Sequence, residues 1–469
     1  MRIPFDRTRL TLAVAGAVLA VTCGTAQGAA FALQEQSGSG LGNAFAGGAA
    51  VAEDASTVWS NPAGMAYLTS AQIAAAAHLI TPSIKFKNDG SAAAQFQPLG
   101  HTGGDAGSTV VVPNLYVAFP VNQQLAVGLG INAPFGLITE YGDGWIGRFQ
   151  AIKSEVRTIN VNPAISWRVS NNLSIGAGAD FQRINATFTN RVNYSAALGQ
   201  AAAQAAAAGQ IPAAAIPGFL GAVTGLEAGA KIDGDDSAWG WNVGAILSLD
   251  PQSRLGAQYR SGFKYHVAGN VEFDRPSLPV LPATLAPIGA ALSNGVNAAL
   301  FNGGVRADIE LPAIANLSYF RQLNDRWDVM ADVQWTGWNK LKSLTFVRTT
   351  GATLGSTPEN FKDAYRFAIG ANYRYSDRWM FRGGIAYDES PVNDTDRTPR
   401  LPDNNRVWLS LGGQYKLSPQ LKFDLGYTYI NAEKANINQN AGSTAGSGLL
   451  KGSYDAHVNI VSGQVTYAF

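Results

Sequence analysis

Apolar and polar residues alternate with a period of two along much of the chain, most clearly in its last third. Between residues 365 and 375 every odd position is apolar and every even position is small or polar. The last stretch repeats the pattern with Val461, Val465, Tyr467 and Phe469 in one row. This period is that of a β-strand whose two faces meet different surroundings. Because aromatic residues stand at the ends of the rows, the pattern predicts strands with one face in lipid and the other toward a lumen.

Short polar turns separate many of these stretches, and longer connections rich in Gly, Pro or Ala separate the others. Six short turns are expected, at residues 120–124, 169–172, 250–253, 322–326, 375–378 and 417–420. Short turns on one side and long loops on the other are typical of outer-membrane barrels, with the turns in the periplasm. Together with seven long connections they join about 14 strands, an even number that places both chain ends on the periplasmic side. The fold class is therefore all-β, a transmembrane antiparallel β-barrel of about 14 strands.

We expect these strands to begin near Gln72, Ser108, Leu125, Glu155, Leu173, Trp239, Ser253, Val305, Trp327, Phe361, Trp379, Arg406, Leu421 and Tyr454.

Composition supports this class. Charged residues make up 14% of the chain, against roughly 25% in soluble domains. After the amino-terminal region no stretch reaches the ~20 apolar residues that a membrane-spanning helix needs, so we predict that strands rather than helices cross the bilayer. The net charge of +1 gives no indication of nucleic-acid binding.

The amino terminus reads as an export signal. Basic residues precede an apolar run over residues 10–21, and small residues follow around residues 26–30. We predict a signal peptide over residues 1–28. Cys23 is the single cysteine, so the mature chain has no disulfide and no cysteine metal site.

Residues 29–68 lie between this signal and the first strand, and they are the candidate plug of the barrel. A barrel of about 14 strands has a lumen too wide for its own side chains to fill, so water or a plug must occupy it. The segment is rich in Gly and Ala and has too few large apolar residues for a core of its own. We therefore expect a small hatch over residues 29–68 inside a barrel formed by residues 69–469.

The third strand is interrupted at Asn132, Pro134 and Gly136. Proline removes a donor from the hydrogen-bond ladder, and glycine within a strand often marks a bulge or kink. These residues predict a local opening in the wall, a candidate lateral exit. The alternative is that Pro134 lies above the membrane, where the strand becomes a loop.

Two long connections, residues 195–231 and 276–301, are unusually apolar for loops on a cell surface. Residues 196–208 read as a helix, and the second loop carries Leu281, Leu285 and Ile288. Two apolar loops that cover each other would leave a groove for hydrophobic ligands. The alternative is a helical pair that packs only for stability.

Several separate blocks of the chain have recognisable sequences. In the hatch these are Phe31, Leu33, Glu35, Ser39 to Gly42, Ala44, Gly47, Glu53, Asp54, Asn61, Pro62 and Ala63. Further blocks are FGLITEY (135–141), FKDAYR (361–366), GIAYDESPV (384–392), residues 406–410 and residues 467–469. Together they resemble the FadL family of outer-membrane long-chain fatty acid transporters, and the resemblance covers essentially the whole mature chain.

The resemblance implies passive uptake of long-chain fatty acids or similar hydrophobic compounds, captured at the apolar loops and released laterally through the kinked third strand. Uptake of aromatic hydrocarbons by the same route is the alternative, because Thr357 stands where fatty-acid-binding relatives carry a basic residue. The candidate substrate-binding residues are Phe31, Leu33, Phe135, Phe188, Arg191, Leu281, Leu285 and Ile288.

Glu53, Asp54, Asn61, Pro62 and Ala63 are the candidate residues that anchor the hatch. We expect the two carboxylates to pair with lumen-facing arginines such as Arg366 or Arg382. Asn61 is expected to cap a turn or to bond to inward polar groups, although an ordinary Asn-Pro turn explains the same residues.

Other function classes have weaker support. A hydrolase would need a Ser and His pair, but His78, His101, His266 and His457 are scattered and no G-x-S-x-G motif exists. A general porin would leave the lumen open, which the hatch segment argues against. We therefore expect no catalytic residue, no cofactor and no metal site, and a monomer surrounded by outer-membrane lipid and lipopolysaccharide.

Overall fold

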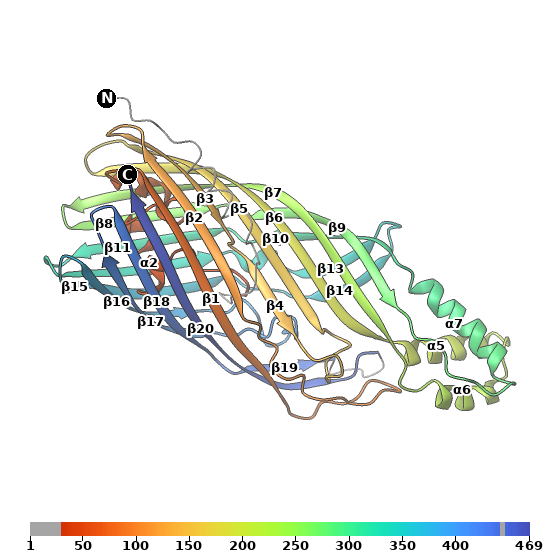
Figure 1. Cartoon of the computed structure of the whole chain (residues 1–469). Helices are drawn as coiled ribbons and strands as arrows, with labels where there is room; N and C mark the ends of the chain where they lie inside the picture. The colour runs from red at the N-terminus through yellow and green to blue at the C-terminus, as the bar shows by residue number, and fades with distance from the viewer. Residues whose placement is uncertain (1–29, 441–445) are drawn as a thin grey trace.

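A computed structural model of the chain describes residues 30–440 and 446–469. Its β-strands form a single antiparallel sheet that closes into a barrel by pairing β20 (Leu450–Ala468) with β1 (Gln72–Asn88). Figure 1 shows the tilted strands, with the carboxy terminus at one end and three helices projecting from the opposite end. The predicted signal peptide at residues 1–28 lies outside the described residues.

The remaining strands follow in chain order. They are β2 (Val110–Pro120), β3 (Leu125–Asn132), β4 (Gly136–Glu140), β5 (Lys153–Arg168), β6 (Leu173–Asn193), β7 (Glu227–Asp250), β8 (Ser253–Arg260), β9 (Phe263–Asp274), β10 (Gly303–Leu311), β11 (Ile314–Gln322), β12 (Trp327–Thr336), β13 (Ser343–Arg348), β14 (Thr353–Pro358), β15 (Ala364–Arg374), β16 (Trp379–Asp388), β17 (Arg406–Lys416), β18 (Leu421–Ala432) and β19 (Ala435–Gln439).

Six barrel strands are each interrupted once, between β3 and β4, β8 and β9, β10 and β11, β12 and β13, β14 and β15, and β18 and β19. Over the described residues the 20 segments therefore amount to 14 barrel strands, as the turn pattern predicts. All six short turns also lie where they were expected; for example, β15 ends at Arg374 and β16 begins at Trp379. The expected strand starts agree to within a few residues except two. The barrel strand formed by β14 and β15 begins at Thr353 and not near Phe361. β7 begins at Glu227 and not near Trp239.

The error at β7 has a physical reason. β6 and β7 run for 21 and 24 residues, whereas about 9–11 residues cross a bilayer. The upper part of β7 is polar on its outer face, with Lys231, Asp233 and Asp235, because it stands in water above the membrane. Without an apolar row there, the alternation is visible only from Trp239 onward.

The outer face of the barrel carries the apolar rows. Phe367, Ile369 and Leu411 are 47%, 57% and 68% exposed. Trp327, Trp379, Tyr375 and Tyr467 gather toward the end with the short turns, where an aromatic girdle is expected at the membrane interface. The inner face carries small and polar residues, so the alternation sorts lipid-facing from lumen-facing side chains.

Residues 30–68 fill the lumen at the end near the carboxy terminus. They form three short helices, α2 (Gly38–Leu41), α3 (Gly48–Val51) and α4 (Thr57–Ser60), and the 3₁₀-helix η1 (Pro62–Tyr67). α2 contacts β17, β18 and β20, α3 contacts β8 and β11, and η1 contacts β5, β6 and β7. The hatch therefore touches much of the circumference of the wall.

Glycines in the wall provide the space for the hatch. A Cβ atom at Gly256 of β8 would lie 2.0 Å from the Ala49 carbonyl oxygen, and one at Gly244 of β7 would lie 2.0 Å from Asn61 Oδ1. At Gly384 of β16 a Cβ would lie 2.3 Å from Asn43. Only glycine allows the hatch backbone to approach so closely.

Four further helical segments lie outside the hatch. α5 (Tyr194–Ala207), η2 (Ala213–Ala215) and α6 (Ile216–Ala222) lie in one loop, α7 (Ala286–Ala299) lies in another, and η3 (Trp338–Lys340) lies at the break between β12 and β13. Within residues 30–440 and 446–469, no helix is both long enough and apolar enough to cross a bilayer.

Candidate functional site

The interruption of the third barrel strand coincides with the first residues of the hatch. β3 ends at Asn132 and β4 begins at Gly136, and both pair with β5. β2 pairs with β3 only as far as Leu115 opposite Ile131. Beyond that point Ala133, Pro134 and Phe135 turn away from the β2 ladder, so the wall has no regular strand pairing there.

Hatch residues 31–33 occupy the inner side of this interruption. The Leu33 amide donates to the Pro134 carbonyl at 2.8 Å, and the Gly136 amide donates to the Phe31 carbonyl at 2.9 Å. Gln36 adds two bonds, donating to the Ala133 carbonyl and accepting from the Asn132 side chain at 2.6 Å. The amino-terminal segment of the hatch therefore replaces the missing wall partner at the kink, with an antiparallel bridge between Ala32 and Phe135.

Phe31 and Phe135 also begin a continuous cluster of aromatic rings in the lumen. The centroids of Phe31 and Phe135 are 6.2 Å apart, and Trp338 lies 4.8 Å from Phe31. Phe361 lies 5.9 Å from Trp338. We call this cluster, with the neighbouring pair Phe188 and Phe346, whose centroids are 5.6 Å apart, the aromatic column. Every ring in it packs edge-on or tilted, the geometry that aromatic pairs prefer.

The column is built from breaks in the strands. Trp338 lies on η3, where residues 337–342 leave the wall between β12 and β13, and it is fully buried. Phe361 lies in the break between β14 and β15, and Phe188 comes from the long strand β6. The column therefore combines rings from two strand breaks with a ring from a continuous strand.

A polar pair stands beside the column at the end away from the hatch. Arg400, in the loop between β16 and β17, lies with its guanidinium carbon 5.2 Å from the centroid of the Phe188 ring. Glu359, two residues before Phe361, is 7% exposed. Burial raises the pKa of Glu359 to about 8, although the positive charge of Arg400 opposes this shift. Burial also lowers the pKa of Arg400, to about 10.

The hatch is held by three groups of polar contacts. Arg382 of β16, which is almost fully buried, makes two hydrogen bonds of 2.7 and 2.8 Å to Glu53 and one of 3.0 Å to Asp424. Burial alone would raise the pKa of Glu53, but the Arg382 charge outweighs it and brings the pKa to about 2. Glu53 thus has an arginine partner of the expected kind.

Asp54 does not pair with an arginine, contrary to the expectation. It accepts hydrogen bonds from Ser39, from the Ser56 amide and from Gln464 of β20. Arg366 instead donates to the Ala44 carbonyl. The two adjacent carboxylates differ because Asp54 caps the turn before α4 and faces a wall strand without a basic residue at that level.

Asn61 bonds to the backbone of both hatch and wall. Its Nδ2 group lies 2.7 Å from the Ala49 carbonyl and 3.1 and 3.2 Å from the Ala245 and Ala257 carbonyls of β7 and β8. Its Oδ1 accepts from the Ala63 amide at 3.0 Å, which caps η1. Pro62 stands at the first position of that helix, where a missing amide hydrogen costs nothing. Asn61 and Pro62 therefore begin η1, and Asn61 also connects the hatch to strands β7 and β8.

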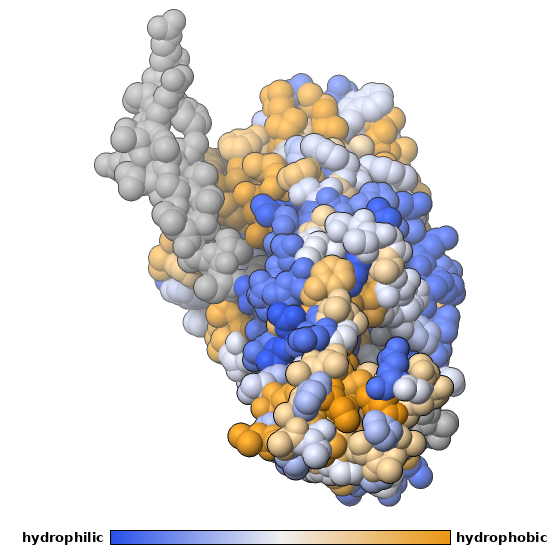
Figure 2. Space-filling model, turned by 90° about the vertical axis from the view of Figure 1, so that its right-hand side faces the viewer, coloured by the Kyte–Doolittle hydropathy of each residue, from blue (hydrophilic) through white to orange (hydrophobic). Residues whose placement is uncertain are grey.

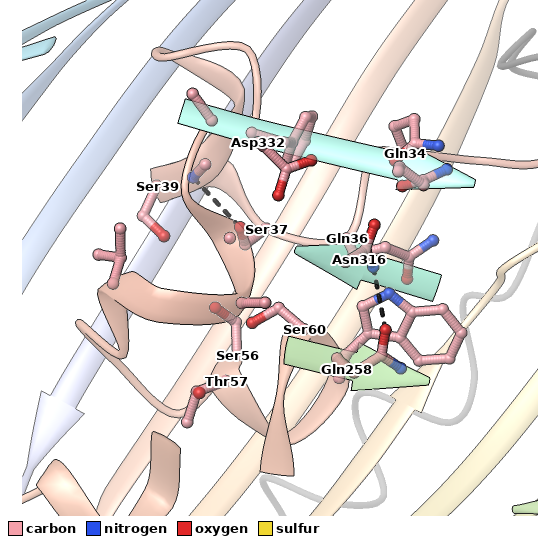
Figure 3. Close-up of a pocket in the computed structure, with 18 of the residues that line it drawn as sticks. Gln34, Gln36, Ser37, Ser39, Ser56, Thr57, Ser60, Gln258, Asn316 and Asp332 are labelled. Atoms are coloured by element: carbon pink, nitrogen blue, oxygen red, sulfur yellow. Dashed lines mark hydrogen bonds between the residues drawn. The ribbon is translucent and has the colours of Figure 1, made fainter. Parts of the chain in front are cut away.

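A cavity of about 110 Å³ lies between the hatch and the wall. Figure 3 shows its polar lining, with Gln34, Ser39 and Ser56 from the hatch facing Gln258, Asn316 and Asp332 from the wall. Asn316 donates to Gln258 at 2.9 Å. A cavity lined this way suits water rather than a hydrophobic chain.

The apolar loops meet at the outer tip of the molecule. Figure 2 shows hydrophobic residues gathered at this protruding end, next to a largely polar surface. Tyr194 and Leu198 of α5, Phe219 of α6, and Leu292 and Val296 of α7 form the buried core of the tip. Leu281, Leu285 and Ile288 pack against it half-buried. The two loops therefore do cover each other, and these three residues lie far from the aromatic column in a separate cluster.

An open cavity of about 820 Å³ adjoins the tip. It is lined by α5, by Phe96 and Phe149, and by Arg191, which pairs with Asp143 at 3.5 Å. Arg191 thus faces the outer cavity and not the column. Of the predicted substrate-binding residues, the structure unites Phe31, Phe135 and Phe188 in one cluster, and it places Leu33 below them against the hatch core.

Sequence reasoning missed Trp338, Phe361, Glu359 and Arg400. Trp338 had a detectable signal, since residues 337–340 break the alternation after β12. Phe361 was expected only as the start of a strand and as part of a matching block, with no role in ligand binding. Arg400 lies in a loop without hydrophobic periodicity, and no neighbouring sequence motif indicates that its side chain faces the lumen.

The structure brings one histidine beside a serine, which the sequence did not suggest. His78 Nδ1 lies 2.5 Å from Ser462 Oγ, and the Asn114 amide group lies 3.0 Å from His78 Nε2. The Asn114 Nδ2 group can only donate, one hydrogen to the Glu35 carbonyl and the other to His78 Nε2, so Nε2 is the acceptor and Nδ1 carries the hydrogen toward Ser462. That tautomer cannot take a proton from the serine, and all three groups are buried. The described ranges also contain no group of three or more His, Cys, Asp or Glu arranged to hold a metal ion.

The sequence and the fold of this chain are both similar to those of known outer-membrane transport proteins. A long-chain fatty acid transport protein of Escherichia coli O6:H1 is 31% identical over 438 residues, covering 93% of this chain and 94% of the relative. The crystal structure of a Pseudomonas aeruginosa FadL homologue superposes with a TM-score of 0.81 at 24% identity, over 94% of this chain and all of the other. The Ralstonia pickettii toluene transporter TbuX shares the fold, with a TM-score of 0.61 at 21% identity over 93% of this chain and all of the other.

The family described as outer membrane protein transport protein (OMPP1/FadL/TodX) matches residues 19–469. This match spans the hatch, the interrupted third strand and the closing strand β20. The chain belongs to the OMPP1/FadL/TodX family of transport proteins of the bacterial outer membrane.

Proposed function

We propose that this protein takes up long-chain fatty acids or similar hydrophobic compounds passively across the outer membrane. Substrate is captured at the apolar tip formed by α5, α6 and α7, moves along the aromatic column, and leaves sideways through the wall at residues 132–136. Curated relatives at 31% identity are named as long-chain fatty acid transport proteins, which supports the substrate class. The process needs no catalytic residue and no cofactor.

One observation carries the lateral route. The aromatic column ends at Phe31 and Phe135, and these two residues stand where the wall ladder is interrupted and patched by the hatch. An apolar ligand at this end of the column faces an apolar destination, the membrane, without crossing the polar cavity below. A straight path to the periplasm would instead pass the hatch and its buried ion pairs.

The route is tested by repairing the strand. Residues 132–136 are replaced by a regular alternating sequence that pairs β3 with β2 and β5 without a break. Uptake of radiolabelled hexadecanoate by cells that express the variant should fall to background, while the barrel stays folded as judged by its heat-modifiable migration on gels.

A matched control repairs a different break. Residues 261–262 between β8 and β9 are replaced in the same manner, and uptake should stay near wild type, because the hatch residues 31–33 do not pair with this break. Normal uptake after repair of residues 132–136 would refute the lateral route. Equal loss from both repairs would show that any stiffening of the barrel stops transport.

Aromatic hydrocarbons are the second candidate substrates. The observation that favours them is the column itself, since Phe31, Trp338 and Phe361 are rings in edge contact. Competition of toluene against hexadecanoate for uptake separates the two classes. A general porin is not supported, because the hatch and the aromatic column occupy the lumen. We also propose that the protein is a monomer whose exposed apolar rows contact lipid and lipopolysaccharide.

A further inference from the structure

The loop between β16 and β17, residues 389–405, folds into the mouth of the barrel instead of extending into solvent. Val392 and Leu401 are 5% and 4% exposed and belong to the same apolar cluster as the aromatic column. The Tyr141 hydroxyl donates to the Pro399 carbonyl at 2.8 Å, and the Thr139 hydroxyl donates to the Arg400 carbonyl at 3.0 Å. Arg400 is therefore held on a backbone that is fixed to β4.

Only one of the three nitrogen atoms of the Arg400 guanidinium forms hydrogen bonds within the described part of the chain. Its Nη1 group donates to Ser154 Oγ at 3.0 Å and, more weakly, to the Lys153 carbonyl at 3.4 Å. Among the described residues, no hydrogen bond or ion pair engages its Nε and Nη2 groups. The guanidinium lies over Phe188, so its unused donors border the aromatic column.

No other cation has this position in the part of the chain that the structure describes. Arg348 lies over Phe301 and donates to the Phe301 carbonyl at 3.0 Å. Arg191 pairs with Asp143 and faces the outer cavity. Arg366 reaches down to the hatch at Ala44. Arg400 is thus the single cation over a ring of the column.

Glu359 completes the polar end of the column. Its carboxyl lies near enough to Arg400 for each group to affect the pKa of the other, yet the two form no ion pair. Because the pKa of Glu359 is about 8, this group is largely protonated and uncharged at pH 7. It therefore neither neutralises Arg400 nor repels an anionic ligand, and a protonated carboxyl can itself donate a hydrogen bond.

From this geometry we infer that Arg400 is a specificity-determining residue that binds the carboxylate of a fatty acid whose tail lies along the aromatic column. The inference rests on the proposed transport function and deepens it. It selects an anionic amphiphile over a neutral hydrocarbon. It also gives the ligand a direction, since the head group is fixed beside Phe188 and the tail points toward Phe31 and Phe135, where the wall is interrupted.

The geometry suits this task. A carboxylate bound by a guanidinium forms charge-assisted hydrogen bonds, which are strongest where water is excluded. Removal of one such interaction costs about 10- to 150-fold in affinity. A methyl ester of the same chain length keeps the tail but lacks the charge, and so separates head-group binding from tail binding.

The experiment measures competition on the purified full-length protein with radiolabelled methyl hexadecanoate as the reporter. Arg400→Gln should weaken competition by unlabelled hexadecanoate about 10- to 150-fold and leave competition by the unlabelled ester within about twofold of wild type. Arg400→Lys, which keeps the charge, should retain most of the preference for the acid. Arg183→Gln, at an exposed ion pair with Asp235, serves as the control and should leave both probes unchanged.

Two results would overturn the assignment of Arg400. Either Arg400→Gln leaves hexadecanoate competition unchanged, or it weakens acid and ester equally, which indicates a role in shaping the column. A selective loss of acid binding in Arg191→Gln with none in Arg400→Gln would place the head group in the outer cavity instead. If the wild-type protein binds neither probe, the proposed function itself fails, and this outcome differs from all the others.

Discussion

The ion pair between Glu53 and Arg382 gives a quantitative test of how the hatch is held. The substitution Glu53→Gln keeps the shape of the side chain but removes its charge from a guanidinium that is 2% exposed. Breaking a buried pair costs about 3–5 kcal/mol. In the variant Arg382 still has Asp424 as a partner at 3.0 Å, and the Glu53 side chain is 20% exposed. We therefore expect a loss of hatch stability at the lower end of this range, about 3 kcal/mol. An equilibrium between seated and displaced hatch then shifts about 150-fold.

Single-channel recording in planar bilayers measures that shift. Brief openings should become roughly two orders of magnitude more frequent in Glu53→Gln than in wild type, while deletion of residues 30–68 should give lasting conductance. The control is Asp235→Asn, which removes an exposed pair with Arg183 and should change little, since such pairs contribute at most about 1 kcal/mol. Opening rates equal to wild type in Glu53→Gln would refute this account of the anchor.

The pH dependence gives an independent check of the same anchor. The pKa of Glu53 in the folded protein is about 2, below its ordinary value near 4.5. Its stabilising contribution is therefore fully present above pH 4.5 and is lost as the pH falls through about 2. Accordingly, a higher opening rate in Glu53→Gln than in wild type should persist from pH 7 down to pH 5. A difference that vanishes already at pH 5 would contradict the ion pair.

Two further predictions concern the fit and the charge of the hatch. Gly256→Ala places a Cβ 2.0 Å from the Ala49 carbonyl oxygen, so it should displace α3 and raise the opening frequency. Gly463→Ala is the control and should behave as wild type, because a Cβ added at Gly463 meets no atom within 4 Å. Glu35→Gln removes a fully buried carboxyl whose oxygens have no hydrogen-bond partner and whose pKa burial raises to about 7. The seated hatch of the wild type loses stability as the pH rises from about 4.5 to 7, because the buried Glu35 resists ionisation. At pH 8 the variant should therefore hold the hatch more firmly than wild type, by up to roughly 3 kcal/mol. At pH 4.5 the two proteins should hold it equally. Equal opening rates of the two proteins at pH 8 would contradict this.

Local rules were sufficient to predict the barrel. A strand that faces lipid must show one apolar row, and a turn between two such strands must be short and polar, so the breaks at residues 375–378 and 417–420 were visible. Pro134 predicted the kink because proline cannot donate to the ladder. Six short turns and this one proline together determine most of the architecture.

The aromatic column was not predictable in the same way. Trp338 and Phe361 come from strand breaks at residues 337–342 and 359–363, and the guanidinium beside Phe188 comes from the loop residue Arg400. These segments are far apart in the chain and converge only when the barrel closes, and a broken alternation does not reveal which way a side chain turns. Phe31, Phe135 and Phe188 were predicted because they stand in or near recognisable blocks, whereas Glu359 and Arg400 depend on how the loop between β16 and β17 folds inward.

Packing of the column bears on how a passive transporter releases its ligand. Each methylene transferred from water to an apolar site gains roughly 0.8 kcal/mol, so a rigid, empty tube would hold a long chain too tightly to let it go. Here Phe31, Phe135 and Trp338 contact one another at 4.8–6.2 Å, and each such ring pair is worth about 0.5–1.5 kcal/mol. A ligand that separates them loses part of its gain, and the rings recover that energy when it leaves. Because Phe31 also bonds to the wall at Gly136, we propose that the movement that admits the tail also loosens the exit.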